Sequence, residues 1–338
     1  MRNTIAAVWF RRLVLLSTLL AFCVVGLGAY VRLSDAGLGC PDWPGCYGYM
    51  SVPESEAAIA QAQVAYPDSP VETHKAWKEM VHRYLAGILG LLVLSLCLLG
   101  WRGRNAIQVS PWTPTVLLGL ITFQALLGMW TVTLLLKPAV VTAHLLGGMA
   151  TLAMLVWIAH RHWGASSGQF LKAELPRFLV RGSLLVLFAQ ILLGGWTSSN
   201  YAALACTDFP TCHGAWLPEM DFQSGFHWIR ELGEGIDGAA LTLPALTAIQ
   251  WIHRIGALVT LIFLGGLGVY LIKYGQLRAL GMLLLAVLLT QIGLGIANLV
   301  LHLPLVLAVA HNLGAALLVI TLVILNSRIT GSGTGRIS

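Results

Sequence analysis

Residues 79–100 read EMVHRYLAGILGLLVLSLCLLG. After Arg83 the stretch has no charged residue, and an α-helix of about 20 apolar residues is long enough to cross the ~30 Å hydrocarbon core of a bilayer. A glutamate, a histidine and an arginine lie together at its first end. The stretch therefore predicts a membrane-spanning helix with its chemically active groups near one membrane face.

Seven further stretches of similar length and apolarity recur along the 338 residues: 13–33, 113–136, 139–159, 177–198, 247–272, 278–301 and 305–326. Hydrophobic residues make up 57% of the chain and charged residues only 10%, against about 25% charged residues in soluble domains. No small-residue cleavage site follows the first stretch, so we expect it to be retained. We predict an all-α polytopic membrane protein with eight transmembrane helices.

The charges predict the orientation of these helices. With a cytoplasmic N-terminus, the inner loops and helix ends hold 13 of the 20 basic residues but only Glu174 of the 14 acidic ones. Basic residues in short loops stay in the cytoplasm, so both termini are expected inside. The basic balance thus reflects topology and indicates no nucleic-acid partner.

Four of the six cysteines form two pairs, Cys40/Cys46 and Cys206/Cys212, in the two long loops predicted outside, 34–77 and 199–246. An oxidising compartment favours disulfides, with a metal site as the alternative. Cys23 and Cys97 fall inside helices, where packing is expected. Within the first long loop, residues 53–63 predict a short surface helix.

The sequence repeats itself at nearly constant offsets. Cys40 and Cys206 are 166 residues apart, and His144 and His311 are 167 apart. A Gln-Ala-Leu-Leu-Gly phrase at 124–128 is echoed at 190–194 and 291–295. We predict two halves, 1–165 and 166–338, forming pseudo-symmetric parallel four-helix bundles related by an axis along the membrane normal.

Four histidines lie near the outer ends of the even-numbered helices: His82, His144, His253 and His311. Ionisable residues inside membrane spans usually mark function. Two imidazoles from neighbouring helices at matched depth supply both axial ligands of a haem, and the repeat predicts one such site per half. The alternative is hydrogen-bonded packing. The other histidines fall in loops or at helix ends, with His302 ambiguous: His74, His160, His162, His213, His227 and His302. Met80, Met129 or Met149 are further candidate ligands.

Two neighbours of the histidines add chemistry. Arg83 and Arg254 each follow a predicted ligand, where a guanidinium can bind a haem propionate or instead reach lipid headgroups. Glu79 lies three residues before His82, whereas Gln250 lies three residues before His253. A carboxylate can act as a base or stabilise positive charge and an amide cannot, unless Glu79 merely faces water. The halves are therefore expected to share ligation but differ in chemistry.

Together these features resemble haem A synthases of the bacterial type: Glu79-x-x-His82-Arg83, Ala143-His144, Gln250-x-x-His253-Arg254, Ala310-His311 and Gly39-Cys-Pro-Asp-Trp-Pro-Gly-Cys46. The resemblance covers nearly all of the membrane portion. It implies a multi-pass protein of the bacterial plasma membrane, with its cysteine loops on the outer, periplasmic side.

The family's activity is oxidation of the C8 methyl of haem O to the formyl group of haem A, by successive hydroxylations and loss of water. The resemblance assigns His253 and His311 to a haem b cofactor, His82 and His144 to the substrate haem, and Glu79 to catalysis. It also implies exchange with haem O synthase and with haem-copper oxidase assembly factors, and allows a homo-oligomer.

Two other functions fit parts of the pattern. A di-haem b-type cytochrome that accepts electrons from quinol would use the four histidines equally well but would leave the Glu79/Gln250 difference unexplained. A transporter would explain internal repeats and buried polar groups, but it is expected to have broken helices near the midplane.

Overall fold

A computed structural model of the chain describes residues 2–107, 109–164, 177–236, 238–274 and 277–330. Eight long helices in this part are apolar enough to span a membrane, which confirms the eight predicted spans. They are α1 (Arg2–Leu33), α3 (Thr73–Arg102), α4 (Trp112–Thr133), α5 (Pro138–Gly164), α6 (Arg177–Ser199), α8 (Leu243–Tyr274), α9 (Arg278–Val300) and α10 (Leu305–Thr330). The described residues include no strand, only three isolated β-bridges.

Several helices are longer than their apolar stretches. α1 begins at Arg2 rather than 13, α3 at Thr73 rather than 79, and α8 at Leu243 rather than 247. Hydrophobicity marks the part that lies in hydrocarbon, whereas backbone hydrogen bonding continues the helix into polar residues beyond it. The predicted surface helix is present as α2 (Glu56–Ala65), where the Ser55 side chain caps the first turn by accepting from the Ala58 N–H.

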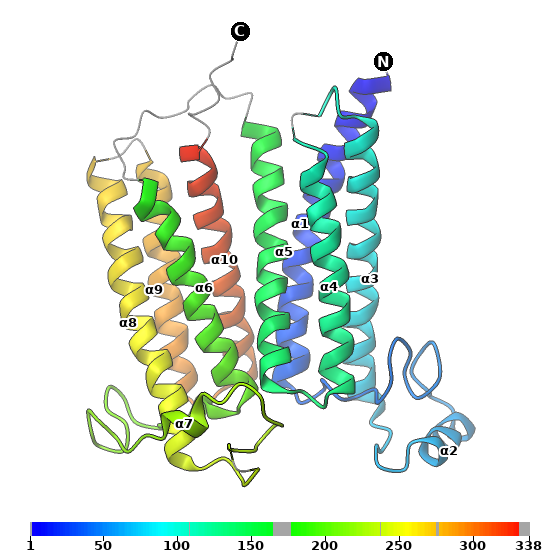
Figure 1. Cartoon of the computed structure of the whole chain (residues 1–338), viewed down its shortest axis with the longest axis vertical. Coiled ribbons are helices and arrows are strands. Elements are labelled where there is room, and N and C mark those ends of the chain that lie inside the picture. Colours follow the sequence, from blue (N-terminus) through cyan, green and yellow to red (C-terminus); the bar gives the residue numbers. More distant parts are fainter. Residues whose placement is uncertain (1, 108, 165–176, 237, 275–276, 331–338) are drawn as a thin grey trace.

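The helices pack in the same cyclic order in each half. In the first half, α1 and α4 each pack against both α3 and α5. In the second, α6 and α9 each pack against both α8 and α10. The two groups meet through α1, α5, α6 and α10 (Figure 1). Each half is therefore a ring of four helices in which α3 and α5, or α8 and α10, lie diagonally opposite.

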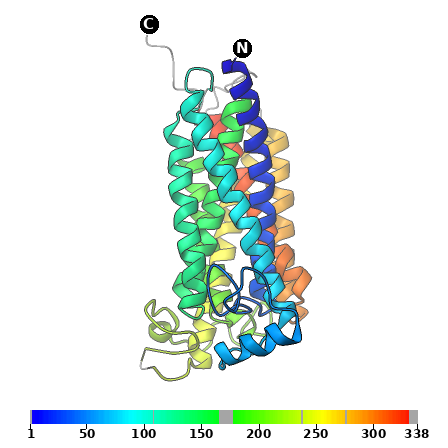
Figure 2. The same cartoon turned by 90° about the vertical axis from the view of Figure 1, so that its right-hand side faces the viewer.

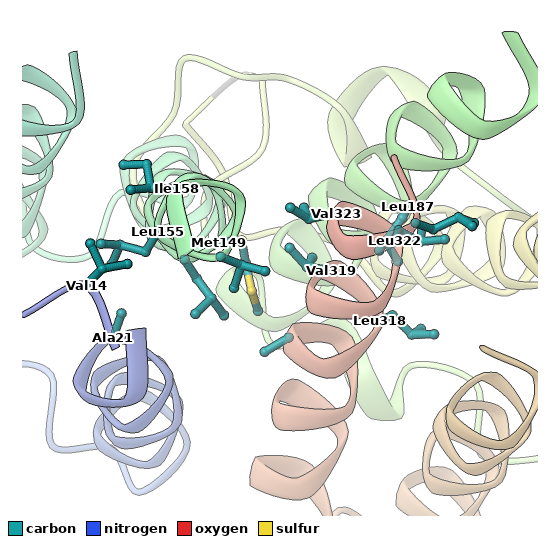
Figure 3. Packing of buried hydrophobic residues seen from close by; sticks show 14 of the residues in the cluster. Val14, Ala21, Met149, Leu155, Ile158, Leu187, Leu318, Val319, Leu322 and Val323 are labelled. Carbon is teal, nitrogen blue, oxygen red and sulfur yellow. The ribbon is translucent and has the colours of Figure 1, made fainter. Parts of the chain in front are cut away.

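One apolar cluster joins the two rings. Met149 of α5 lies on the side facing Val319 and Val323 of α10, Leu155 of α5 lies toward Val14 of α1, and the cluster extends to Leu187 of α6 (Figure 3). The outward faces are apolar as well, with Leu91, Leu185 and Val306 at least 66% exposed. Large apolar side chains on the outside are what a bilayer solvates and water does not.

The loops divide between the two ends of the bundle. The start of α1 and the end of α10 lie at one end, and α2 and the short α7 (Phe222–Gly225) lie at the other (Figures 1 and 2). Arg102, Lys273 and Arg328, in the last turns of α3, α8 and α10, share the end that holds the termini. The boundary predicted at 165/166 and the residues Lys172, Glu174 and Arg336 fall outside the described residues.

We predict that Gly281→Ala destabilises the contact between α8 and α9. A Cβ at Gly281 would lie 2.9 Å from the backbone oxygen of Gly268 and 2.8 Å from Leu271 Cβ, so the helices must separate. Overpacking of this kind typically costs about 1–3 kcal/mol. Thermal unfolding in detergent measures the effect. Gly293→Ala, in the same helix but with open space around it, is the control; an equal melting temperature for both variants contradicts this packing.

Candidate functional site: two pairs of histidines in one cavity

The four histidines occupy matched positions in the two rings. His82 and His253 lie about two and a half turns into α3 and α8, and His144 and His311 nearly two turns into α5 and α10. At ~1.5 Å rise per residue they lie roughly 9–15 Å from the start of each helix. Within each half the pair is close enough for direct electrostatic interaction. The paired helices lie diagonally across each ring of four helices, so the prediction that the two histidines come from neighbouring helices is wrong.

All four histidines line one cavity of about 1900 Å³ that extends through both halves. Small-molecule pockets are typically about 300–1,000 Å³, so this space suits a large ligand or two ligands. Its walls are mainly apolar helix surface, and Glu79, Arg83, Gln250 and Arg254 line it as well. A wide apolar cavity with few polar groups fits a flat, largely hydrophobic ligand.

A glycine on an adjacent helix makes room for each imidazole. A Cβ at Gly28 would lie 3.0 Å from His82 Cε1, and one at Gly128 would lie 3.3 Å from His144 Cε1. In the second half, Gly194 and Gly295 give corresponding distances of 3.2 and 3.1 Å to His253 and His311. The glycines come from α1, α4, α6 and α9, the other diagonal of each ring. The histidines are thus held edge-on against bare backbone.

The imidazole nitrogens fit metal ligation. The Nδ1 atoms of His82, His144 and His311 are buried, with no hydrogen-bond partner among the described residues. A buried polar atom without a partner costs free energy, so native structures usually supply one. Two imidazoles facing one cavity in each half provide the nitrogen pair that haem iron takes as axial ligands.

Glu79 and Gln250 hold the two outer loops in the same way. The N–H of Cys40 donates to Glu79 Oε2 at 3.0 Å, and the N–H of Cys206 donates to Gln250 Oε1 at 2.7 Å. Each side chain is 5% exposed. The alternative that Glu79 merely faces water is therefore wrong. The two side chains share a loop-anchoring role and differ in charge.

Both cysteine pairs form disulfides, which confirms that prediction and excludes the metal alternative for these sulfurs. The loops share an internal frame, since Asp42 accepts from the N–H groups of Tyr47 and Gly48, and Asp208 from those of His213 and Gly214. Hydrogen bonds from the Thr211 hydroxyl and the Gly214 N–H hold the pKa of Asp208 well below its usual range. The loop therefore keeps a fixed anionic anchor at neutral pH.

The two arginines also bind the disulfide loops. Arg83 forms an ion pair with Glu79 and donates to the carbonyls of Asp42 and Gly45, while Arg254 donates to those of Thr211 and Cys206. Both border the cavity. Each arginine thus links its loop to the helix that holds a histidine, and a ligand in the cavity meets a guanidinium that is already fixed.

Of the other histidines whose side chains the structure describes, none lines the cavity. His302 lies exposed in the turn before α10, and His160 contacts Ser327 near the opposite ends of the helices. Among the three methionines, Met149 borders the cavity. The sequence did not predict that Gln190 and Gln291 contact His253 and His311, although the repeated Gln-x-x-x-Gly phrase was the available signal. Arg230 is buried and donates a hydrogen bond to Asn200. The sequence did not predict this contact, because Arg230 lies in an irregular loop.

Comparison with known proteins gives a consistent assignment. Residues 11–323 match the family described as Cytochrome oxidase assembly protein, COX15-CtaA. The chain is 46% identical over 94% of its length to the Heme A synthase of Shewanella oneidensis, of which it covers 95%. It is 29% and 26% identical to the Heme A synthases of Caulobacter vibrioides and Halalkalibacterium halodurans, over 88% and 87% of this chain and 90% and 88% of theirs. The matched range spans the four histidines and both disulfide loops. The chain therefore belongs to the haem A synthase family of cytochrome oxidase assembly proteins.

Proposed function

We propose that this protein is an oxidoreductase that oxidises the C8 methyl of haem O to the formyl group of haem A. The observation that carries the proposal is the duplicated pair of half-buried histidines that line one cavity, with a carboxylate beside one pair and an amide beside the other. The names of its relatives support the same reaction. A porphyrin with an isoprenoid tail also suits a large apolar cavity between membrane helices.

In this proposal the two halves have different ligands. His253 and His311 hold a haem b cofactor, and His82 and His144 receive the haem O substrate. A bound haem b supplies one-electron redox chemistry, while the protein fixes its orientation and surroundings. Arg83 and Arg254, already held by the loops, meet the propionates at the edge of each site.

Glu79 is the proposed catalytic group. It lies one helical turn before His82, borders the cavity, and is held by Arg83 and the Cys40 N–H. A fixed carboxylate there stabilises positive charge that develops at the methyl carbon, or orients the water that adds to it. Gln250 makes the equivalent loop contact without a charge, which suits a half that binds a cofactor without transforming it.

The orientation and partners complete the proposal. Residues 1–165 and 166–338 form pseudo-symmetric halves related by an axis along the membrane normal, which the common packing order supports. The excess of basic residues at the end with the termini favours a cytoplasmic location for both, with the disulfide loops outside the bacterial plasma membrane. Haem O synthase supplies the substrate, haem-copper oxidase assembly receives the product, and a homo-oligomer is compatible with this arrangement.

Turnover of haem O by the purified protein is the direct test of this function. We expect hydroxylated haem and then formyl haem to accumulate when the haem-loaded protein is incubated with haem O and an electron acceptor. Mass spectrometry of extracted haems identifies the products. Protein whose haems are reduced and reoxidised while haem O stays unchanged would instead be a di-haem cytochrome.

Glu79→Gln separates chemistry from loop anchoring, because Gln250 shows that an amide can accept the loop N–H. We expect the variant to bind haem but to form haem A about 100-fold more slowly or worse, within the range typical of lost acid–base or charge catalysis. Glu79→Ala should lose both roles, so its Cys40–Cys46 disulfide should also be reduced faster by added thiol. Full turnover by Glu79→Gln would remove Glu79 from the mechanism.

The histidine pairs should respond differently to substitution. His253→Ala or His311→Ala is expected to remove the resident haem, because one axial ligand is lost from a tightly held site. His82→Ala should retain that haem and chiefly impair haem O binding. Absorbance spectra and haem-to-protein ratios measure both effects. Normal spectra for all three variants would contradict the ligand assignment.

A further inference from the structure

Three of the four histidines face a helix that carries a glutamine one turn before the glycine beside the imidazole. The glutamine–glycine pairs lie on α4, α6 and α9, and all six residues line the cavity: Gln124 and Gly128, Gln190 and Gly194, Gln291 and Gly295. The same four-residue spacing in three helices places an amide close to the helix that carries the facing histidine.

Two of the amides, those of Gln190 and Gln291, contact the facing histidine, whereas Gln124 Nε2 has no hydrogen-bond partner among the described residues and lies against Gly147, three residues after His144. Gln190 Nε2 lies 3.0 Å from His253 Nδ1 and donates to the His253 backbone carbonyl at 3.0 Å. Gln291 Nε2 lies 3.4 Å from His311 Nε2. A side chain that bonds both ring and backbone, as Gln190 does, fixes the rotation of the imidazole about its own helix.

Each amide needs a second glycine, three residues after the histidine. A Cβ at Gly147, Gly256 or Gly314 would lie only 1.6, 2.2 or 2.1 Å from an amide atom of Gln124, Gln190 or Gln291. A Cβ at this glycine would displace the amide, so each glutamine keeps its observed position only beside a glycine.

At His82, the first of the two histidines in the first half, both the glutamine and the second glycine are missing. By the 166-residue offset that relates the cysteine pairs, Val24 of α1 is the residue equivalent to Gln190, and Gly28 is equivalent to Gly194. Three residues after His82 stands Leu85, where the other three histidines have glycine. Val24 also lines the cavity, so an apolar side chain replaces the amide there. The Nδ1 atoms of His82, His144 and His311 are all unpartnered in the described part of the chain, so what distinguishes His82 is the missing amide and the missing second glycine.

We propose that Gln124, Gln190 and Gln291 are positioning residues that hold three of the ligand histidines, and that Val24 and Leu85 leave His82 as the exchangeable ligand. The inference rests on the proposed function, in which the first half must admit haem O and release haem A while the second keeps its haem. Outer contacts to metal-ligating histidines typically change metal affinity 10–100-fold. Release of His82 alone is enough to let a substrate haem exchange, while Gln124 keeps His144 in position.

Haem transfer to apomyoglobin tests this without any turnover. In a His253→Ala background, which leaves only the first site, Val24→Gln/Leu85→Gly should slow the loss of added haem b by roughly 10- to 100-fold. In a His82→Ala background, Gln190→Val should speed haem loss from the second site by a similar factor. Thr321→Val is the control, since it removes a buried hydroxyl of α10 that bonds only its own helix and lies outside the cavity lining.

Electron paramagnetic resonance adds a readout that general destabilisation does not move. The g-values of a low-spin ferric haem with two imidazole ligands depend on the angle between the ring planes, so Gln190→Val should shift and broaden them, and Thr321→Val should not. If Val24→Gln/Leu85→Gly does not fold, the Gln190→Val result alone decides. Unchanged loss rates and spectra in folded variants would overturn the inference and leave haem A synthesis intact, whereas absence of haem from both sites in the unmodified protein would overturn both proposals.

Discussion

Four imidazoles that line a cavity inside a membrane-spanning bundle impose the constraint on which the site depends. Hydrocarbon offers no hydrogen bonds, so each ring nitrogen must find a partner inside the protein or from a ligand. The fold meets this demand with a ring of four helices in each half. Histidines project from one diagonal, and glycines on the other diagonal let the rings approach the backbone. Nitrogens such as His82 Nδ1 and His144 Nδ1 have no hydrogen-bond partner among the described residues.

The duplication makes the differences between halves informative. Both halves have the same disulfide loop, anchored by residue 79 or 250 and clasped by Arg83 or Arg254. Against this common frame, a carboxylate replaces an amide beside His82, and an apolar residue replaces the glutamine that would steady it. Both changes fall in the half proposed to handle the substrate. Under the proposed function, the same frame serves a cofactor site in one half and a substrate site in the other.

Much of this architecture could be predicted from the sequence because its signals are local or repeated. Apolar stretches predicted the eight spans, and the repeat singled out the histidines and the cysteine pairs. What failed depended on contacts between distant segments. The histidine-bearing helices are diagonal, not adjacent, and Glu79 anchors a loop that lies about 40 residues earlier in the chain. The Gln190 phrase was visible, but only packing shows that its amide reaches His253.

The central claim is that one iron lies between the two histidines of each half, and a cryo-electron microscopy map of the haem-loaded protein tests it most directly. We expect two porphyrins, one with iron between His253 and His311 and one with iron between His82 and His144. Both should lie nearer the end of the bundle that holds the disulfide loops. Iron bound across the two halves, or histidine rings turned out toward the detergent, would contradict it.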